Sequence, residues 1–137
     1  MFPPSAICDV LSRSDYVVLA APLIESTQAL MNAERIAQMK PAAYLINVSR
    51  GPLVDDAALI AALRQKSIAG AALDVFTKEP LPDDSPYWDL ENVLITPHTA
   101  AVTERLWDRH YDLISENLER YLSGKSLLAV VDKQRGY

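Results

Sequence analysis

The sequence has few of the residues that build a disulfide framework, a metal centre or a glycine-rich phosphate loop. Its 137 residues include one cysteine (Cys8), two histidines and four glycines. A single cysteine excludes an internal disulfide framework and is typical of a reducing compartment, so we expect a cytoplasmic protein. The histidines and the cysteine lack metal-ligand spacing, and we expect no metal site. The glycines, Gly51, Gly70, Gly124 and Gly136, form neither a G-x-G-x-x-G nor a Walker A pattern.

Positive charge and long apolar runs are also scarce. The formal net charge is -5 at pH 7 and no basic stripe is present, so we expect neither nucleic acid nor a membrane surface as a partner. No apolar run reaches the roughly 20 residues of a membrane span. The first residues show no basic segment followed by an apolar core, and we expect no signal peptide. Hydrophobic residues make up 50% of the chain, which is enough for the core of one domain.

Four apolar runs predict the strands of a parallel sheet. They lie at residues 16–21, at the start of 44–51, at 68–76 and at 93–96. Because these runs are apolar throughout, we expect strands that are buried on both faces. The spacing of apolar residues predicts helices at residues 7–14, 33–39, 56–65 and 103–122. Strands that alternate with helices predict an α/β fold, with right-handed crossovers and a long C-terminal helix.

A distinctive residue follows each predicted strand. Pro22, Arg50, Asp74 and His98 stand at or just beyond the carboxyl ends of the four runs. In open α/β sheets these ends lie along one edge, where ligands bind, so we expect the four residues to converge. The guanidinium of Arg50 is a rigid, always-charged fork that suits a carboxylate. The alternative is an ordinary surface arginine at a strand end.

His98 and Glu79 are suited to proton transfer. A histidine can give or take a proton near neutral pH, and a carboxylate beside it fixes its tautomer and favours its protonated form. Together with Arg50, the pair suits the reduction of a carbonyl next to a carboxylate. The hydride would come from a cofactor, because no side chain can supply one. The alternatives are structural: His98 as a turn residue, Glu79 as solvated surface, and Asp74 as a cap for the turn after its strand.

Other side chains are interpreted as structural. We expect Tyr87 and Trp88 to anchor their loop by hydrophobic contact, with a substrate platform as the alternative. His110 lies inside the predicted long helix, with no motif around it. Cys8 has no neighbour in sequence that would activate its thiol, so we expect it to be inert.

Taken together, these motifs resemble the C-terminal part of the D-isomer-specific 2-hydroxyacid dehydrogenase family. The matching blocks follow in order and cover nearly the whole chain. They are 21–27 (Ala-Pro-Leu through Thr), 39–51 (ending Ile-Asn-Val-Ser-Arg-Gly), 53–55 (Leu-Val-Asp), 71–80 (Ala-Ala-Leu-Asp-Val-Phe through Glu-Pro) and 96–98 (Thr-Pro-His). The resemblance implies a partial Rossmann-type sheet of about four strands. It also implies NAD or NADP as cofactor and a small 2-oxo or 2-hydroxy acid as substrate.

The resemblance also implies roles for individual residues. Arg50 matches the arginine that binds the substrate carboxylate, His98 the proton donor, and Glu79 the acid that supports the histidine. Asp74 matches the aspartate at the nicotinamide end of the cofactor. The positions expected to contact the cofactor are Pro22, Thr27, Val48, Ser49, Arg50, Asp74, His98 and Ala100.

The chain also departs from the family. Family members are longer, and they carry a substrate domain and a glycine-rich βαβ unit ahead of the matching part. We therefore expect residues 1–137 to be the C-terminal half of a nucleotide-binding domain, with residues 123–137 returning toward the substrate domain. Without a glycine-rich turn the pyrophosphate has no helix N-terminus to bind, so we expect this chain to be inactive alone. The alternatives are a non-catalytic remnant that only folds or associates, and a nucleotide- or protein-binding module.

The missing half would leave apolar surface uncovered. The strand predicted at 16–21 would lie at an open edge of the sheet, and such edges pair with other strands. Exposed apolar faces also favour association. We therefore expect a homo-oligomer, or association with a chain that carries the missing N-terminal half.

Overall fold

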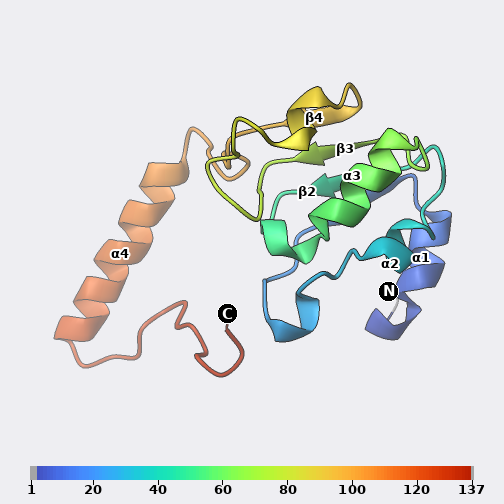
Figure 1. Ribbon diagram of the computed structural model, residues 1–137. Coiled ribbons are helices and arrows are strands. Elements are labelled where there is room, and N and C mark those ends of the chain that lie inside the picture. Colours follow the sequence, from blue (N-terminus) through green and yellow to red (C-terminus); the bar gives the residue numbers. More distant parts are fainter. Residues whose placement is uncertain (1–2, 137) are drawn as a thin grey trace. The chain divides into compact units, whose positions relative to one another are not determined.

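The computed structural model describes residues 3–136, and the chain divides into two compact units, Met1–His98 and Thr99–Tyr137. The first unit contains a sheet of four parallel strands in the order β1-β2-β3-β4 (Figure 1). This confirms the predicted α/β fold with a parallel sheet. The strands are β1 (Tyr16–Leu19), β2 (Tyr44–Asn47), β3 (Gly70–Leu73) and β4 (Val93–Ile95), and the helices of this unit are α1 (Ile7–Arg13), α2 (Ala33–Ile36) and α3 (Asp56–Arg64).

The helices of the first unit lie along one side of the sheet (Figure 1). α2 and α3 each connect strands that are neighbours in the sheet. Right-handed crossovers between such strands place their helices on the same face. The strand side chains that point toward the helices form the core, and Leu19, Leu45 and Leu73 are at most 6% exposed. Their burial provides the main hydrophobic stabilisation of this unit.

The other face of the sheet carries exposed apolar side chains. Tyr16, Val18 and Leu94 are 68%, 57% and 65% exposed. The rings of Tyr16 and Tyr44 stack on this face with their centroids 5.8 Å apart. The expectation that the strands are buried on both faces is therefore wrong for the part of the chain that the structure describes. Apolar composition showed which segments were strands, but it did not show how many layers cover them.

The regular elements are shorter than the runs that predicted them. Of the run at 68–76, only Gly70–Leu73 is a strand, and its pairing with β4 covers Ala71 to Leu73. The helix predicted at 33–39 is α-helical only through Ile36. Beyond that point the amides of Gln38 and Met39 bond to carbonyls three residues earlier, which tightens the chain into turns.

Tyr87 anchors the long loop between β3 and β4. It belongs to a short 3-10 helix, Pro86–Asp89, and is 3% exposed. Its hydroxyl donates to Asp56 Oδ1 at the start of α3, over 2.8 Å, and its ring lies 5.9 Å from that of Phe76. Burial and the neighbouring carboxylate raise the pKa of Tyr87 above its usual range, so the hydroxyl stays protonated. The anchor interpretation is confirmed for Tyr87, whereas Trp88 is 52% exposed.

The second unit contains α4 (Leu106–Leu122) together with the segments before and after it. This helix begins three residues later than the predicted range 103–122. Gly124 ends it with a φ of +66°, the left-handed conformation that glycine adopts without strain. The Asn117 side chain holds the following segment by bonding to both the amide and the carbonyl of Leu128, at 2.7 and 3.2 Å. Between residues 3 and 136 we find no helix with the length and apolar character needed to cross a membrane.

Candidate functional site

The turn after β2 presents Arg50 and is held by partly buried hydrogen bonds. Asn47, which is 1% exposed, donates from Nδ2 to the Arg50 carbonyl (2.9 Å) and accepts at Oδ1 from the Ser49 amide (3.1 Å). Ser49 Oγ donates to the carbonyl of Ala21, 2.5 Å away, and so ties this turn to the segment after β1. Asn47 is not among the site residues predicted from the sequence. Its only signal there is a polar side chain at the end of an apolar run.

Gly51 brings the Arg50 turn against the loop that carries Glu79. A Cβ atom at Gly51 would lie 2.0 Å from the carbonyl carbon of Phe76 and 2.3 Å from the amide nitrogen of Thr77. Side chains do not fit at such distances, so this close backbone contact requires glycine. The contact holds the backbone of the Arg50 turn against the backbone of the loop that carries Glu79.

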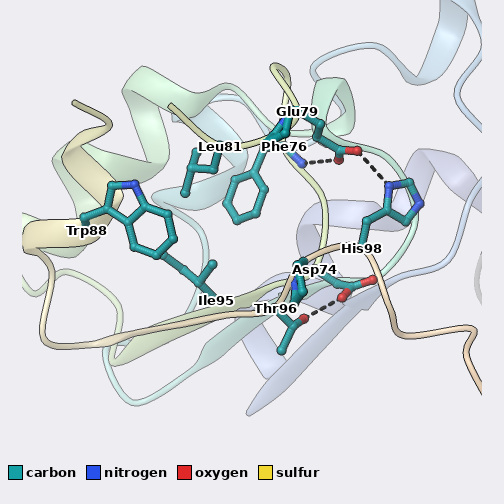
Figure 2. A pocket seen from close by; sticks show the side chains of 10 residues that line it. Asp74, Phe76, Glu79, Leu81, Trp88, Ile95, Thr96 and His98 are labelled. Carbon is teal, nitrogen blue, oxygen red and sulfur yellow. Dashed lines mark hydrogen bonds and ion pairs between the residues drawn. The ribbon is translucent and has the colours of Figure 1, made fainter. Parts of the chain in front are cut away.

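Glu79 and His98 form a direct pair at the carboxyl edge of the sheet (Figure 2). His98 Nδ1 lies 2.7 Å from Glu79 Oε2, and Glu79 Oε1 accepts from the amide of Phe76 at 2.9 Å. The backbone of His98 has a φ of +55°, and its amide donates to the carbonyl of Asp74 at 2.8 Å. A histidine in the left-handed region is uncommon. Such a residue persists where its surroundings hold it, as the two bonds of His98 do here.

The environment of Glu79 favours its ionised form. The hydrogen bond from His98 is the main cause that lowers the pKa of Glu79, followed by the bond from the Phe76 amide. The charges of His98 and Arg50 act in the same direction, while partial burial opposes them. An ionised Glu79 attracts the imidazolium form of His98 and fixes the orientation of the ring.

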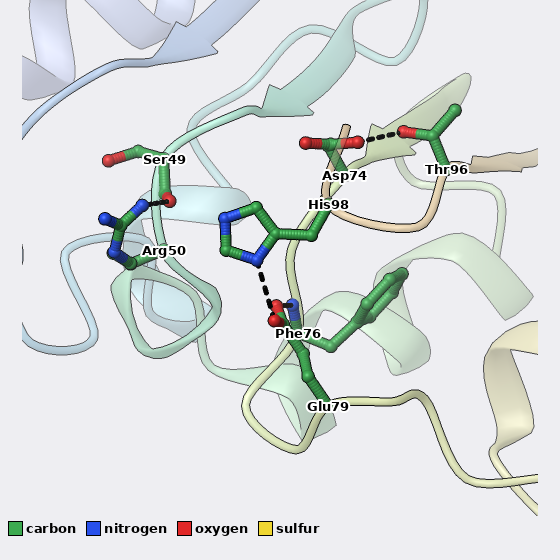
Figure 3. A network of polar contacts seen from close by, with 7 residues as sticks. All are labelled: Ser49, Arg50, Asp74, Phe76, Glu79, Thr96 and His98. Atoms are coloured by element: carbon green, nitrogen blue, oxygen red, sulfur yellow. Dashed lines mark hydrogen bonds and ion pairs between the residues drawn. The ribbon is translucent and has the colours of Figure 1, made fainter. Parts of the chain in front are cut away.

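Arg50 lies on one side of the His98 ring (Figure 3). The arginine is exposed, and its Nη1 donates to the carbonyl of Ser49 at 2.6 Å. The remaining guanidinium N–H groups can bind a planar anion. The structure therefore brings together Arg50, Glu79 and His98, which lie far apart in the sequence.

Asp74 lies at the same edge and is 4% exposed. Its Oδ1 accepts from Thr96 Oγ1 at 2.5 Å, which joins the ends of β3 and β4 (Figure 3). Val48, on the uncovered face of the sheet, is 43% exposed. In the loop predicted beside adenosine, the hydroxyl of Thr27 donates to the Pro22 carbonyl at 2.7 Å. Ala100 belongs to the second unit.

Comparison with known proteins identifies the family. Residues 3–100 match the family model described as "D-isomer specific 2-hydroxyacid dehydrogenase, NAD binding domain". The chain belongs to this family. The match confirms the resemblance read from the sequence blocks, and it confirms a nicotinamide dinucleotide as the cofactor of the matched domain type.

Individual relatives agree with this assignment. The chain is 45% identical over 125 residues to a glyoxylate reductase of Thermofilum pendens, covering 91% of this chain and 37% of the relative. A D-isomer specific 2-hydroxyacid dehydrogenase of Xanthobacter autotrophicus Py2, solved with NADPH and MES, is 48% identical with a TM-score of 0.88, covering 97% of this chain and 54% of that one. A glyoxylate/hydroxypyruvate reductase of Sinorhizobium meliloti, solved with NADP and sulfate, is 32% identical with a TM-score of 0.90, covering 99% and 44%.

The relatives are longer than this chain. It spans 37% of the Thermofilum pendens protein and 38% of a glyoxylate/hydroxypyruvate reductase B of Pectobacterium carotovorum. The similarity to the solved structures confirms the Rossmann-like fold of the NAD-binding domain for this chain.

Gly51→Ala is expected to disturb the site through the backbone. The added methyl group would overlap the peptide between Phe76 and Thr77, so the free energy of unfolding should fall by about 1–3 kcal/mol. The Glu79 loop would move, its bond to His98 would weaken, and the pKa of Glu79 would rise toward its usual value. Chemical denaturation measures the stability, and NMR titration of the side-chain carboxyl carbon measures the pKa.

Gly124→Ala is the matched control for this prediction. A Cβ there meets open space but would adopt a positive φ, so we expect a loss of about 1–2 kcal/mol and no change at Glu79. If the pKa of Glu79 is the same in Gly51→Ala and the parent chain, the proposed backbone coupling is contradicted.

Acid is expected to break the His98–Glu79 pair by protonating Glu79. The pKa of Glu79 in the folded chain is below its ordinary value of 4.5. Its contribution to stability is therefore complete above about pH 4.5 and is lost as the pH falls through the lower, folded-state pKa. His98→Asn removes the hydrogen bond that is the main cause of the lowered pKa of Glu79. The free energy of unfolding of this variant should therefore fall less steeply than that of the parent as the pH decreases below about 4.5.

Urea denaturation between about pH 3 and pH 7 measures the effect. His110→Asn is the control, because His110 lies on α4 of the second unit and has no hydrogen bond to Glu79 among those of the described residues. A stability difference between His98→Asn and the parent that stays constant down to the lowest pH would show that the pair does not titrate as described.

Proposed function

We propose that this chain carries the acid–base and substrate-binding side of an NAD(P)-dependent reductase of small 2-oxo acids. The observation that carries the proposal is the 2.7 Å contact between His98 Nδ1 and Glu79 Oε2 beside an exposed arginine. Family membership supports it, as do relatives that are named glyoxylate and hydroxypyruvate reductases. The reaction would reduce the carbonyl of a 2-oxo acid to the alcohol of a 2-hydroxy acid.

The side chains divide this work between them. Arg50 would bind the carboxylate of the substrate and orient the neighbouring carbonyl. His98 uses Nδ1 for Glu79, so Nε2 would donate the proton that the carbonyl oxygen needs as it becomes an alcohol. Glu79 would stabilise the imidazolium before transfer and hold the ring in place afterwards. In the reverse direction the neutral imidazole would accept the proton.

The residues present fit the nicotinamide end of the cofactor. NAD(P)H supplies the hydride when bound. The Asp74 carboxylate, oriented by Thr96, suits the amide of a nicotinamide, and Val48 offers an exposed apolar contact beside the Arg50 turn. The fit does not extend to the pyrophosphate, because the glycines of this chain form no G-x-G-x-x-G turn.

We therefore propose that residues 1–137 act as the C-terminal half of a nucleotide-binding domain, with residues 123–137 leading toward a substrate domain. The chain by itself would lack a binding site for the pyrophosphate of the cofactor and would not turn over substrate. The alternative is a module that only folds and associates, which the uncovered apolar face of the sheet favours. The single cysteine, which is exposed as a free thiol, supports a cytoplasmic location.

Substitution of Arg50 or His98 is expected to reduce turnover strongly. The test uses a protein in which this chain is joined to a glycine-rich dinucleotide-binding unit and a substrate domain. His98→Asn removes the proton donor and should lower kcat by about 10²- to 10⁴-fold. Arg50→Ala removes the guanidinium that would bind the substrate carboxylate, so KM should rise and kcat/KM should fall. Arg50→Lys should give intermediate values. Oxidation of NADPH or NADH, followed by absorbance, measures both.

Arg64→Ala and His110→Asn are the matched controls. Both residues are exposed, Arg64 lies at the end of α3, and His110 belongs to the second unit. Parent-like rates in His98→Asn or Arg50→Ala would remove the role proposed for that residue.

We also propose that the edge strand β1 and the uncovered face of the sheet bind a second protein surface, either another copy or the N-terminal half of the domain. β1 is the first strand in the sheet order and carries exposed Tyr16 and Val18.

The chain is expected to self-associate at micromolar concentration in sedimentation velocity. Val18→Lys should shift it toward monomer, whereas Val102→Lys, at an exposed position of the second unit, should not. A monodisperse parent monomer would count against the proposal.

A further inference from the structure

A cavity of about 460 Å³ opens beside His98 (Figure 2). It lies within the first unit and falls in the size range of small-molecule sites. Four lining residues, Asp74, Glu79, Thr96 and His98, are polar and belong to the site described above. The others are apolar, and they are Phe76, Pro80, Leu81, Trp88, Ile95 and Pro97.

The two kinds of lining residue are separated in space. Figure 2 shows the paired side chains of Glu79 and His98 at one end of the cavity and Trp88 at the other. Phe76, Leu81 and Ile95 lie between these ends. A ligand that fills this cavity would have a polar head near the histidine and an apolar body of several carbons.

The far wall is held in place before any ligand binds. Trp88 Nε1 donates to the carbonyl of Pro82 at 2.8 Å, which fixes the ring against its own loop. The adjacent residue, Tyr87, anchors that loop to Asp56 of α3. A half-exposed indole whose N–H is already bonded presents apolar surface at little further cost in conformational entropy.

The order of the groups around His98 matches the order of groups in a 2-oxo acid. Arg50 lies on one side of the imidazole and the Phe76 ring on the other (Figure 3). In a 2-oxo acid the carbonyl lies between the carboxylate and the side chain. When the carboxylate of the acid binds Arg50 and its carbonyl lies at His98, the side chain of the acid therefore points toward Phe76 and the apolar cavity beyond it.

We propose that the cavity between His98 and Trp88 binds the side chain of the substrate and selects 2-oxo acids with branched aliphatic or aromatic side chains. This inference rests on the proposed function and adds the substrate class. Glyoxylate, for which several relatives are named, has only a hydrogen at this position and would leave the apolar walls without a contact. Each methylene group moved from water into an apolar site is worth about fourfold in affinity, so side-chain size should dominate selection.

The fluorescence of Trp88 provides the test in the full 137-residue chain. The sequence contains two tryptophans, so Trp107→Phe, an exposed position on α4, leaves Trp88 as the single reporter. The probes are pyruvate, 4-methyl-2-oxopentanoate and isobutyl methyl ketone, which has the same branched chain without the carboxylate. We expect 4-methyl-2-oxopentanoate to shift the emission to the blue and to bind at least tenfold more tightly than pyruvate.

Variants at the far wall separate packing from a general effect on binding. Trp88→Ala should reduce the preference for the branched acid over pyruvate to below about threefold, mainly by weakening the binding of the branched acid. Trp88→Phe should retain most of the preference. Because these variants lack the reporter, their affinities are measured by ligand-observed NMR, which is also applied to the parent.

Failure of this inference is distinguishable from failure of the proposed function. Equal affinities for pyruvate and the branched acid would overturn the side-chain site and leave the carboxylate and carbonyl roles intact. Binding of the ketone as tightly as the branched acid would support the cavity and contradict the carboxylate role of Arg50. Absence of binding by all three probes would overturn the cavity as a ligand site, whereas the turnover of His98→Asn tests the proposed function independently.

Discussion

The carboxylate of Glu79 joins the two backbone segments on which the site depends. One oxygen accepts from the amide of Phe76 and fixes its own loop, and the other binds the ring of His98 after β4. The close contact of Gly51 with the same loop adds the turn that carries Arg50. Because each link uses a backbone atom or a short bond, three charged or polar groups keep their separation without being buried together. Such an exposed arrangement would be accessible to the 2-oxo acid that we propose as substrate.

The sheet that supports this edge is covered by helices on one face. Consecutive strands lie side by side, and their right-handed connections place the helices together. The opposite face keeps an apolar surface that includes Tyr16, Val18 and Leu94. The chain also spans less than half the length of the curated relatives described above. The exposed apolar face is the surface to which we propose that another polypeptide segment binds.

Different parts of the site could be read from the sequence to different degrees. The chemical types of Arg50, Glu79 and His98 are visible in the sequence, and the convergence of Arg50 and His98 follows from the rule that strand ends share one edge. Thr96 and Asn47 act through hydrogen bonds to Asp74 and to the Arg50 turn, and no local pattern indicates such partners. Adjacency in the sequence suggests the same anchoring role for Trp88 as for Tyr87. Adjacent residues on a short helix face different surroundings, so one is a buried anchor and the other lines a cavity.

The sequence by itself determined the α/β class, the four strands and the family, and it pointed to the three side chains proposed for the chemistry, because these depend on local apolar runs and on residue type. Tertiary structure alone decided where strands and helices end, which face of the sheet is covered and which atoms meet. Those features arise from contacts between segments far apart along the chain, such as Gly51 with Phe76 and Glu79 with His98. The free energy of such contacts depends on distances that no single segment encodes.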